Sequence, residues 1–373
     1  MTKLDTNTFG AFFALLRAGL WEKSVELLPL GELNFDALYN LASEQAVIGL
    51  VAAGLEHVSD RKITKPEALQ FMKTVFSLEG RNTAMNLFLG ELTAKMRKAR
   101  IYAILVKGQG VGQCYERPLW RSSGDVDFFL DKENYSKAKA FLTPLSSDVD
   151  SEDRRRLHLG MTIDTWTVEL HGTMHTEISH RVNMCLDAIQ RNIFVQGNVR
   201  AWNDNGVDII LPAPTDDAMI IFSHFIQHFF DGGIGLRQIC DWCRLLWFYR
   251  EQIDKDLLWS YLKDMGLVSE WRAFGFFSVS CLGMPQDAMP FYKSTPRLSH
   301  LSKRICRLII KTGNLGQNIN EDYRGKYPML IEKSITFWRR FWEFAQLSTL
   351  FPLDAPKFFL TYVVRRTRAT FSK

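Results

Sequence analysis

A short polar stretch that turns abruptly into an apolar one constrains this chain most. Residues 119–142 read LWRSSGDVDFFLDKENYSKAKAFL, so Asp-Val-Asp leads directly into Phe-Phe-Leu. Residues two apart in a β-strand point to the same face, so Asp125 and Asp127 would lie side by side. Two carboxylates that close repel each other unless a cation lies between them. The stretch therefore predicts a strand that presents a pair of acids to a cation.

A glycine turn precedes the acidic stretch. Residues 101–106, IYAILV, form a short apolar run typical of a buried strand, and KGQG follows at residues 107–110. A short helix is expected from Gln109 to Glu116, because Pro118 limits its extension. Backbone N–H groups at such a turn, together with the positive end of a helix dipole, suit a phosphate group.

A third acid lies on a later strand. After the charged loop SSDVDSEDRRR, the segments HLGMTID and WTVELHGTM are strand candidates joined by a tight connection near Asp164. Alternation puts Glu169 and His171 on one face of the second segment. Three carboxylates on neighbouring strands suit two divalent ions with oxygen ligands, which Mg²⁺ prefers. With the glycine turn they predict a site for phosphoryl transfer, in which positioning and charge neutralisation supply most of the catalysis.

Helical periodicity surrounds this strand-rich middle of the chain. Apolar residues at three- and four-residue spacing predict helices before residue 99 and again after residue 211, with Thr215 as an N-cap. We therefore expect an α+β protein with a small mixed β-sheet core flanked by helical regions. The expected regions are an N-terminal helical region at 1–98, an α/β core at 99–211 and a C-terminal helical region at 212–373.

Composition excludes several classes of protein. The chain has 373 residues, 46% of them hydrophobic and 13% aromatic, which is ample for sizeable cores and excludes wholesale disorder. Its net charge of +5 comes without runs of like charge, so it neither demands nor excludes nucleic acid. The start of the chain lacks the layout of a secretory signal, and no uncharged apolar run is long enough for a membrane span. We expect a cytoplasmic protein without stable membrane insertion.

Two pairs of residues resemble metal or redox motifs. Cys240 and Cys243 form a C-x-x-C pair inside the apolar run LRQICDWCRLLWFY, where two buried small hydrophobic residues are the favoured interpretation over a redox or metal site. His224 and His228 are four apart on a predicted helix, a spacing that allows shared metal ligation. Because no third ligand accompanies them, histidines satisfied within the core or a groove are favoured.

The motifs together resemble a known group of enzymes. ILVKGQGVGQCY, RSSGDVDFFL and VELHG are similar to the nucleotidyltransferase superfamily that includes DNA polymerase β. More narrowly, they resemble a bacterial family of uncharacterised nucleotidyltransferases, over roughly residues 40–260. The matching positions are Lys107, Gly108, Arg121, Gly124, Asp125, Asp127, Glu169 and His171. Gln109 departs from the superfamily, which usually has Ser there, and the third acid is Glu where Asp is commonest.

The resemblance implies a mechanism. Asp125 and Asp127 would bind two Mg²⁺ ions, with Mn²⁺ as a possible replacement, and Glu169 would complete the ion nearer the acceptor and help deprotonate its hydroxyl. That oxygen would attack the α-phosphorus of an NTP, with ATP favoured, and expel pyrophosphate. The residues implied in nucleotide binding are Lys107, Gly108, Gln109, Arg121 and Gly124. Arg121 has three open roles: contacting the phosphates, orienting the turn at Gly124, or forming a structural ion pair with Asp125 or Asp131.

Two other functions stay open at this level. The first is a glycosyltransferase whose D-x-D motif holds Mn²⁺ and a nucleotide-sugar. The second is an inactive module that still binds a nucleotide, which Gln109 in the phosphate turn leaves possible. For a transferase, a small-molecule acceptor is favoured over RNA or a protein. The lack of dense basic patches makes long nucleic acid the less attractive acceptor.

Overall fold

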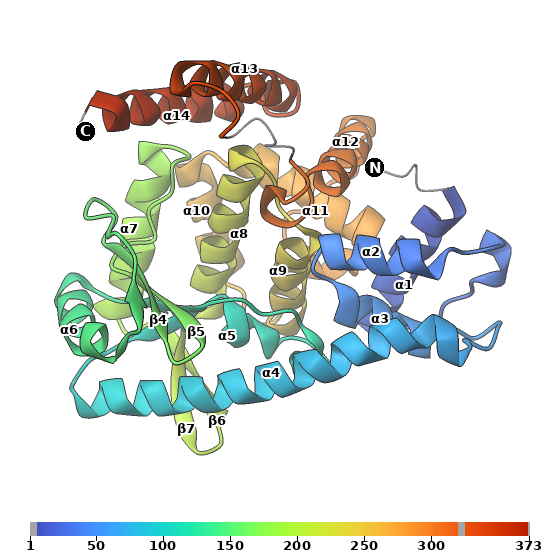
Figure 1. Ribbon diagram of the computed structural model, residues 1–373, viewed down its shortest axis with the longest axis horizontal. Helices are drawn as coiled ribbons and strands as arrows, with labels where there is room; N and C mark the ends of the chain where they lie inside the picture. Colours follow the sequence, from blue (N-terminus) through green and yellow to red (C-terminus); the bar gives the residue numbers. More distant parts are fainter. Residues whose placement is uncertain (1–5, 320–324, 372–373) are drawn as a thin grey trace.

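The computed structural model describes residues 6–319 and 325–371, and its fold is mixed α+β (Figure 1). This confirms the predicted fold class. The α-helices are α1 (Thr6–Trp21), α2 (Phe35–Glu44), α3 (Ile48–Glu56), α4 (Lys65–Lys98), α5 (Gly108–Gly112), α6 (Lys132–Leu142), α7 (His180–Phe194), α8 (Pro214–Asp231), α9 (Leu236–Phe248), α10 (Lys255–Met265), α11 (Val268–Leu282), α12 (Pro296–Thr312), α13 (Met329–Ser348) and α14 (Asp354–Phe371).

A five-stranded mixed sheet forms the centre of the α/β part. Its strands are β1 (Ile104–Val106), β2 (Val126–Phe129), β3 (Asp148–Val149), β4 (His158–Ile163) and β5 (Trp166–His171), in the order β1-β2-β5-β4-β3. Only β2 and β5 pair in parallel, and the other neighbours are antiparallel. The register sets Asp127 opposite Glu169 and His158 opposite His171. Three adjacent strands therefore present these side chains to one face of the sheet.

The other face of the sheet is apolar. Val126 and Phe128 of β2 and Leu170 of β5 are buried there against helices α4 and α6. Because side chains alternate along a strand, this burial forces Asp127 and Glu169 to the opposite face. The predicted alternation in VELHG is thus what the structure shows.

Helix α4 is the longest element, with 34 residues. Its first turn carries a capping box, in which the backbone N–H of Thr64 donates to Oε2 of Glu67 at 2.8 Å. The first half of α4 packs against α2 and α3, and the second half crosses beneath the sheet (Figure 1). In that second half, Met85, Leu89 and Met96 belong to the same buried cluster as the apolar face of the sheet.

The C-terminal half of the chain forms a helical layer over the polar face of the sheet. Helices α8 and α9 lie at its centre, where Phe222, Phe225 and Trp242 pack together with ring centroids 5.1–5.6 Å apart. Helices α13 and α14 lie side by side at the outer edge of this layer (Figure 1). In the described ranges, no helix is long and apolar enough to cross a membrane.

Some local predictions were wrong. The first strand begins at Ile104, and α5 ends at Gly112, short of the predicted Glu116, because its glycines favour helix poorly. Helix α8 begins at Pro214, so Thr215 is not its N-cap; the Thr215 hydroxyl accepts instead from the backbone N–H of Asp254 at 2.9 Å.

A two-stranded hairpin was missed. Strands β6 (Val199–Asp204) and β7 (Val207–Pro212) pair antiparallel around a two-residue loop of Asn205 and Gly206. Both loop residues have positive φ, at 49° and 85°. An Asn-Gly loop of this kind is a strong local signal for a hairpin turn.

The cysteines of the C-x-x-C pair are fully buried in α9. Burial raises the pKa of the Cys243 thiol to about 12 and that of Cys240 well above its usual value. Both thiols therefore pack as small hydrophobic groups, in line with the favoured interpretation of the sequence.

Candidate active site

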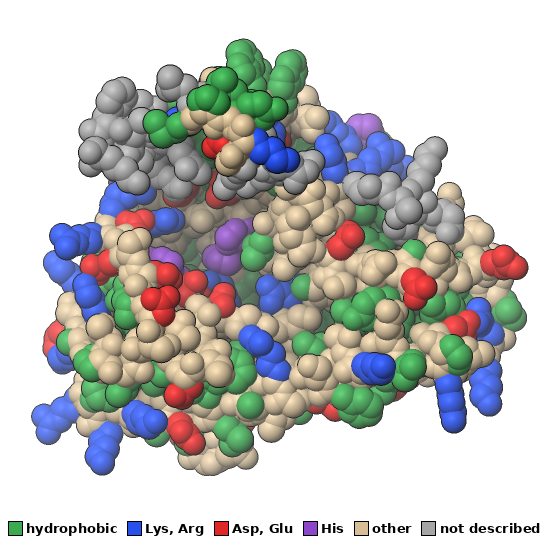
Figure 2. All heavy atoms as spheres, viewed as in Figure 1, with side chains coloured by type: hydrophobic (Ala, Val, Ile, Leu, Met, Phe, Trp, Pro, Cys, Tyr) green, Lys and Arg blue, Asp and Glu red, His purple; other side chains and the backbone are tan. Residues whose placement is uncertain are grey.

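A cavity of about 380 Å³ separates the polar face of the sheet from helices α8 and α9. Figure 2 shows acidic and histidine side chains gathered in this hollow, above the ends of β4 and β5. We call the strand side of the cavity the sheet wall, made of Lys107, Asp125, Asp127, His158, Glu169 and His171. We call the opposite side the helix wall, made of His224, His228, Arg237 and Asp241.

The three predicted acids meet on the sheet wall. Asp127 and Glu169 are register partners on parallel strands, and Asp125 lies just before β2 on the same face. All three line the cavity. The local cause is the alternation of β2 and β5, which buries each intervening valine, phenylalanine or leucine on the far side of the sheet.

Lys107 and His171 hold Asp127. Nζ of Lys107 lies 2.7 Å from its Oδ1, and Nε2 of His171 donates to the same oxygen at 2.8 Å. Burial disfavours a charge here, but Lys107 and His171 together lower the pKa of Asp127 below its usual range. In turn, Asp127 and Glu169 outweigh burial and raise the pKa of His171. The carboxylate therefore stays ionised although it is buried.

Glu169 is held by histidines on both sides. Nε2 of His158 and Nε2 of His171 lie 3.2 and 3.3 Å from its Oε2. Hydrogen bonds from these two imidazoles lower the pKa of Glu169 to about 2. His158 did not stand out in the sequence, although alternation in HLGMTID, paired antiparallel with WTVELH, would have put it beside His171.

Asp125 contrasts with its two neighbours. No ion pair reaches its carboxylate from any residue that the structure describes, and partial burial together with Glu169 and Asp127 raises its pKa. Asp125 therefore lies beside two other carboxylates and has no ion-pair partner among the described residues. A divalent cation at this point would remove the repulsion.

The glycine turn lies beside the acids. Lys107 and Gly108 both have positive φ, at 58° and 43°, and both line the cavity. This conformation, at the junction of β1 and α5, aims the Lys107 side chain across the sheet at Asp127. The side chain of Gln109 turns the other way and donates to Oδ1 of Asn86 on α4 at 2.7 Å. Gln109, predicted in nucleotide binding, therefore directs its side chain to α4 and is not among the residues that line the cavity.

Arg121 pairs with a residue that the sequence did not indicate. Its Nε and Nη2 each donate to a carboxylate oxygen of Asp241 at 2.7 Å, in a fully buried bidentate pair. The hydroxyl of Tyr115 donates to the same carboxylate at 2.8 Å. The predicted partners Asp125 and Asp131 are thus wrong, because Asp241 reaches Arg121 from α9.

The same segment is fixed on its other side. Nδ2 of Asn82 on α4 donates to the backbone carbonyls of Leu119 and Arg121 at 2.7 and 2.8 Å, and Nη1 of Arg237 donates to that of Ser122 at 2.9 Å. These bonds hold the backbone that leads into Gly124 and the acids. Of the three roles open for Arg121, its contacts fit orientation of this turn best.

The two histidines of the helix wall are neutral imidazoles. Nε2 of His224 lies 3.3 Å from Nζ of Lys107, and Nε2 of His228 lies 3.2 Å from Nε2 of His224. Burial, followed by the charge of Lys107, lowers the pKa of His224 well below its usual value and that of His228 to about 4. The two residues therefore face the cavity as uncharged groups.

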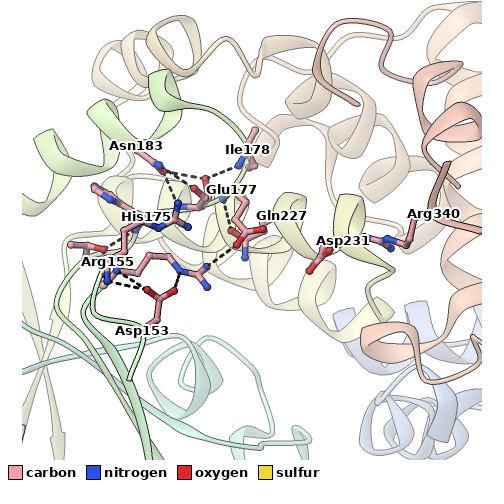
Figure 3. A network of polar contacts seen from close by, with 12 residues as sticks. Asp153, Arg155, His175, Glu177, Ile178, Asn183, Gln227, Asp231 and Arg340 are labelled. Atoms are coloured by element: carbon pink, nitrogen blue, oxygen red, sulfur yellow. Dashed lines mark hydrogen bonds and ion pairs between the residues drawn. The ribbon is translucent and has the colours of Figure 1, made fainter. Parts of the chain in front are cut away.

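A polar network fixes one end of the cavity (Figure 3). The segment between β5 and α7 is tied to α8, because the backbone N–H of Glu177 donates to Oε1 of Gln227 at 3.0 Å. Arg156 reaches Glu177 at 3.5 Å and Asp153 at 2.8 Å. Nε2 of His175 lies 2.7 Å from Oδ1 of Asp187. This end of the cavity therefore offers hydrogen-bonding side chains in fixed positions.

Comparison with known proteins decides the family. A model of the family described as "Uncharacterised nucleotidyltransferase" matches residues 31–275, which include both walls of the cavity. The chain belongs to this family. No curated protein and no solved structure matches this chain. The predicted relationship to uncharacterised nucleotidyltransferases is confirmed; a bacterial origin stays a prediction, as do the finer details of the reaction.

Membership of this family indicates the general kind of ligand that the protein binds. A nucleotidyltransferase binds a nucleotide, and the nucleotidyltransferase chain has one cavity wall with three carboxylates and a lysine beside a glycine turn. The comparison assigns no role to individual residues, so those roles rest on the geometry alone.

Proposed function

We propose that this protein is a Mg²⁺-dependent nucleotidyltransferase that moves a nucleoside monophosphate from an NTP to a hydroxyl of a small molecule, with release of pyrophosphate. The observation that carries the proposal is the meeting of Asp125, Asp127 and Glu169 on the sheet wall beside Lys107. We take ATP as the first nucleotide to test.

The residues of the sheet wall fit divalent cations. Asp125, Asp127 and Glu169 offer hard oxygen donors, and Asp125 has a raised pKa that a nearby cation would reverse. These three residues would hold two Mg²⁺ ions. Bound there, the ions would neutralise the charge that builds up on the phosphate oxygens during transfer.

The protein's own groups would position the nucleotide. We assign the turn at Lys107 and Gly108 to the β- and γ-phosphates, because Gly108 faces the cavity and Lys107 carries the positive charge. Lys107 would leave Asp127 in part and pair with phosphate once cations occupy the site. Arg121 and Gly124 would act through the fixed backbone that leads into the acids.

The reaction itself balances simply. The acceptor oxygen bonds to the α-phosphorus, the bond from that phosphorus to the pyrophosphate oxygen breaks, and the hydroxyl proton passes to solvent. Since two imidazoles hold the pKa of Glu169 near 2, its carboxylate is a poor proton acceptor at neutral pH. We therefore assign Glu169 to charge and position, in place of the proton removal that the resemblance implied.

The cavity favours a small acceptor. Its volume of about 380 Å³ lies within the range of roughly 300–1,000 Å³ that is usual for small-molecule sites. Arg156, His175 and Gln227 line the end beyond the acids, where they are held by the network of Figure 3. These side chains suit an acceptor with hydroxyl or anionic groups.

The test is a turnover assay with the full chain. The protein would be incubated with each NTP, Mg²⁺ and a metabolite extract, and pyrophosphate release would be measured while mass spectrometry identifies any molecule that gains a nucleotide. Asp127→Asn should lower the rate by about 10²–10³-fold, because it removes charge from the centre of the site. Asp148→Asn, on the exposed edge strand, is the matched control and should leave the rate unchanged.

Each alternative has its own result. Release of a nucleoside diphosphate from a nucleotide-sugar would identify a glycosyltransferase. Nucleotide binding without turnover in any extract would identify an inactive module. An undiminished rate of transfer in Asp127→Asn would overturn the assignment of the acids.

A further inference from the structure

Two histidines and one glutamate of the sheet wall converge on a single point. Nε2 of His158 and Nε2 of His171 lie 3.2 and 3.3 Å from the same oxygen of Glu169, Oε2. One ligand atom from each residue can be chosen so that all lie within 4.8 Å of one another. We call these three residues the His–Glu–His cluster.

The backbone imposes this convergence. His171 and Glu169 are two apart on β5 and share a face, and His158 is the register partner of His171 on β4. The two imidazole rings are close together, with centroids 4.7 Å apart. The cluster therefore depends on strand register and not on a mobile loop.

The spacing matches the ligand shell of one small cation. Two ligand atoms that each lie about 2.0–2.1 Å from a tetrahedral zinc-type ion are roughly 3.3 Å apart. The two distances to Oε2 of Glu169 are 3.2 and 3.3 Å, so both pairs already have this separation. The strands therefore already hold both histidines at the distance from Glu169 that shared ligation of one ion requires.

The cluster is open to the cavity. The side chains of His158, Glu169 and His171 keep 35%, 27% and 13% of their exposure, and all three line the cavity. A site with three protein ligands keeps a fourth position for water or a substrate atom, which is the arrangement of catalytic zinc-type sites. That fourth position would face the cavity.

The donor atoms decide the kind of ion. Mg²⁺ takes oxygen ligands, whereas imidazole nitrogen suits zinc, iron, cobalt and nickel. We propose that the His–Glu–His cluster binds one transition-metal dication of the zinc class, distinct from the Mg²⁺ held by Asp125 and Asp127. This ion would take the place of the Mg²⁺ nearer the acceptor, a role that rests on the proposed function, and would hold the acceptor oxygen at its open position.

The experiment measures metal binding directly. The full chain would be stripped with a chelator, and Zn²⁺ affinity and stoichiometry would be determined by competition with a chromophoric chelator, with and without a large excess of Mg²⁺. Co²⁺ would serve as a spectroscopic probe, because its visible absorption reports nitrogen ligands and coordination number. We expect one Zn²⁺ per chain, not displaced by Mg²⁺.

His158→Gln is the decisive variant. It removes one nitrogen ligand and leaves Asp125 and Asp127 untouched, so Zn²⁺ affinity should fall by about 100-fold or more. His300→Gln, at an exposed position of α12, is the matched control and should bind Zn²⁺ as the wild type does. Equal Zn²⁺ affinity in His158→Gln and wild type, or no preference for Zn²⁺ over Mg²⁺ in the wild type, would overturn the proposal.

A second measurement uses the wild-type chain, so that the proposal can be tested even if the His158→Gln variant does not fold. Zn²⁺ should protect the more exposed His158 from acylation by diethyl pyrocarbonate, as read by mass spectrometry, and should leave His300 reactive. Absence of that protection would also overturn the proposal.

The two proposals fail separately. Transfer with Mg²⁺ but no tight Zn²⁺ binding would refute the His–Glu–His cluster as a metal site and leave the nucleotidyltransferase standing. Zn²⁺ binding that depends on His158, without transfer of any nucleotide, would do the reverse.

Discussion

The two walls of the cavity are built on opposite electrostatic plans. On the sheet wall, the carboxylates and Lys107 are charged and face the cavity, and the pKa of His171 beside them is raised by Asp127 and Glu169. On the helix wall, the histidines are neutral, and the carboxylate of Asp241 is buried in a bidentate ion pair with Arg121. The ion pairs of the sheet wall can thus be replaced by contacts with a bound ligand, whereas the ion pair of the helix wall stabilises the fold. Substitutions on the sheet wall should affect ligands, and those on the helix wall should affect folding.

The largest effect on stability is expected at Asp241. Asp241→Asn leaves the guanidinium of Arg121 buried without a counter-charge, which costs about 3–5 kcal/mol in the free energy of unfolding. Urea denaturation followed by circular dichroism would measure this loss, with Asp148→Asn as the control. A stability equal to the wild type would mean that the helix wall is not the framework of the site.

The second largest effect on stability is expected from acid, through His228 of the helix wall. The pKa of His228 is about 4 in the folded chain and about 6.5 in an unfolded one. Between these values the unfolded chain binds a proton that the folded chain does not, so the free energy of unfolding falls as the pH falls, by up to about 3 kcal/mol. His228→Asn should flatten this dependence in urea denaturation from neutral pH to about pH 4, and His300→Gln should not. An unchanged slope in His228→Asn would show that another group carries the acid sensitivity.

The smallest effect on stability is expected on the sheet wall, with the opposite sign. The raised pKa of Asp125 means that its charge is unfavourable in the absence of a cation. Asp125→Asn should therefore raise the free energy of unfolding by a few tenths of a kcal/mol, since solvent screens much of the repulsion. The same variant should lose Mg²⁺ binding, measured by calorimetry. A clear loss of stability would contradict the view that this wall is built for a ligand and not for folding.

More residues of the sheet wall than of the helix wall could be predicted from the sequence, for a physical reason. Strand alternation is a short-range rule, so Asp125 and Asp127 could be placed on one face from neighbouring residues alone. Glu169 was added as an acid on a neighbouring strand, in line with the family resemblance, and the register of β2 with β5 places it opposite Asp127. The pair of Arg121 and Asp241 joins residues 120 apart in the sequence, and no local pattern reports it. His158 falls between these cases, because alternation places it on a face but only the register with β5 brings it to Glu169.

The remaining errors came from signals that compete locally. The hairpin around Asn205 and Gly206 carried a recognisable turn but little strand alternation, since its side chains are mostly half-exposed. Thr215 is a residue type that caps helices, yet Pro214 takes the first helical position and frees the hydroxyl for Asp254. The division of the chain at residues 98 and 211 stays a prediction.

The length of α4 has a practical consequence for anyone who shortens this chain. The last four turns of that helix supply the floor on which the five strands rest, through Met85, Leu89 and Met96. A truncated version that started at residue 99 would lack this half of α4 and would expose the apolar face of the sheet to water. Expression trials of a minimal catalytic piece should therefore begin ahead of Thr64, whose cap starts the helix.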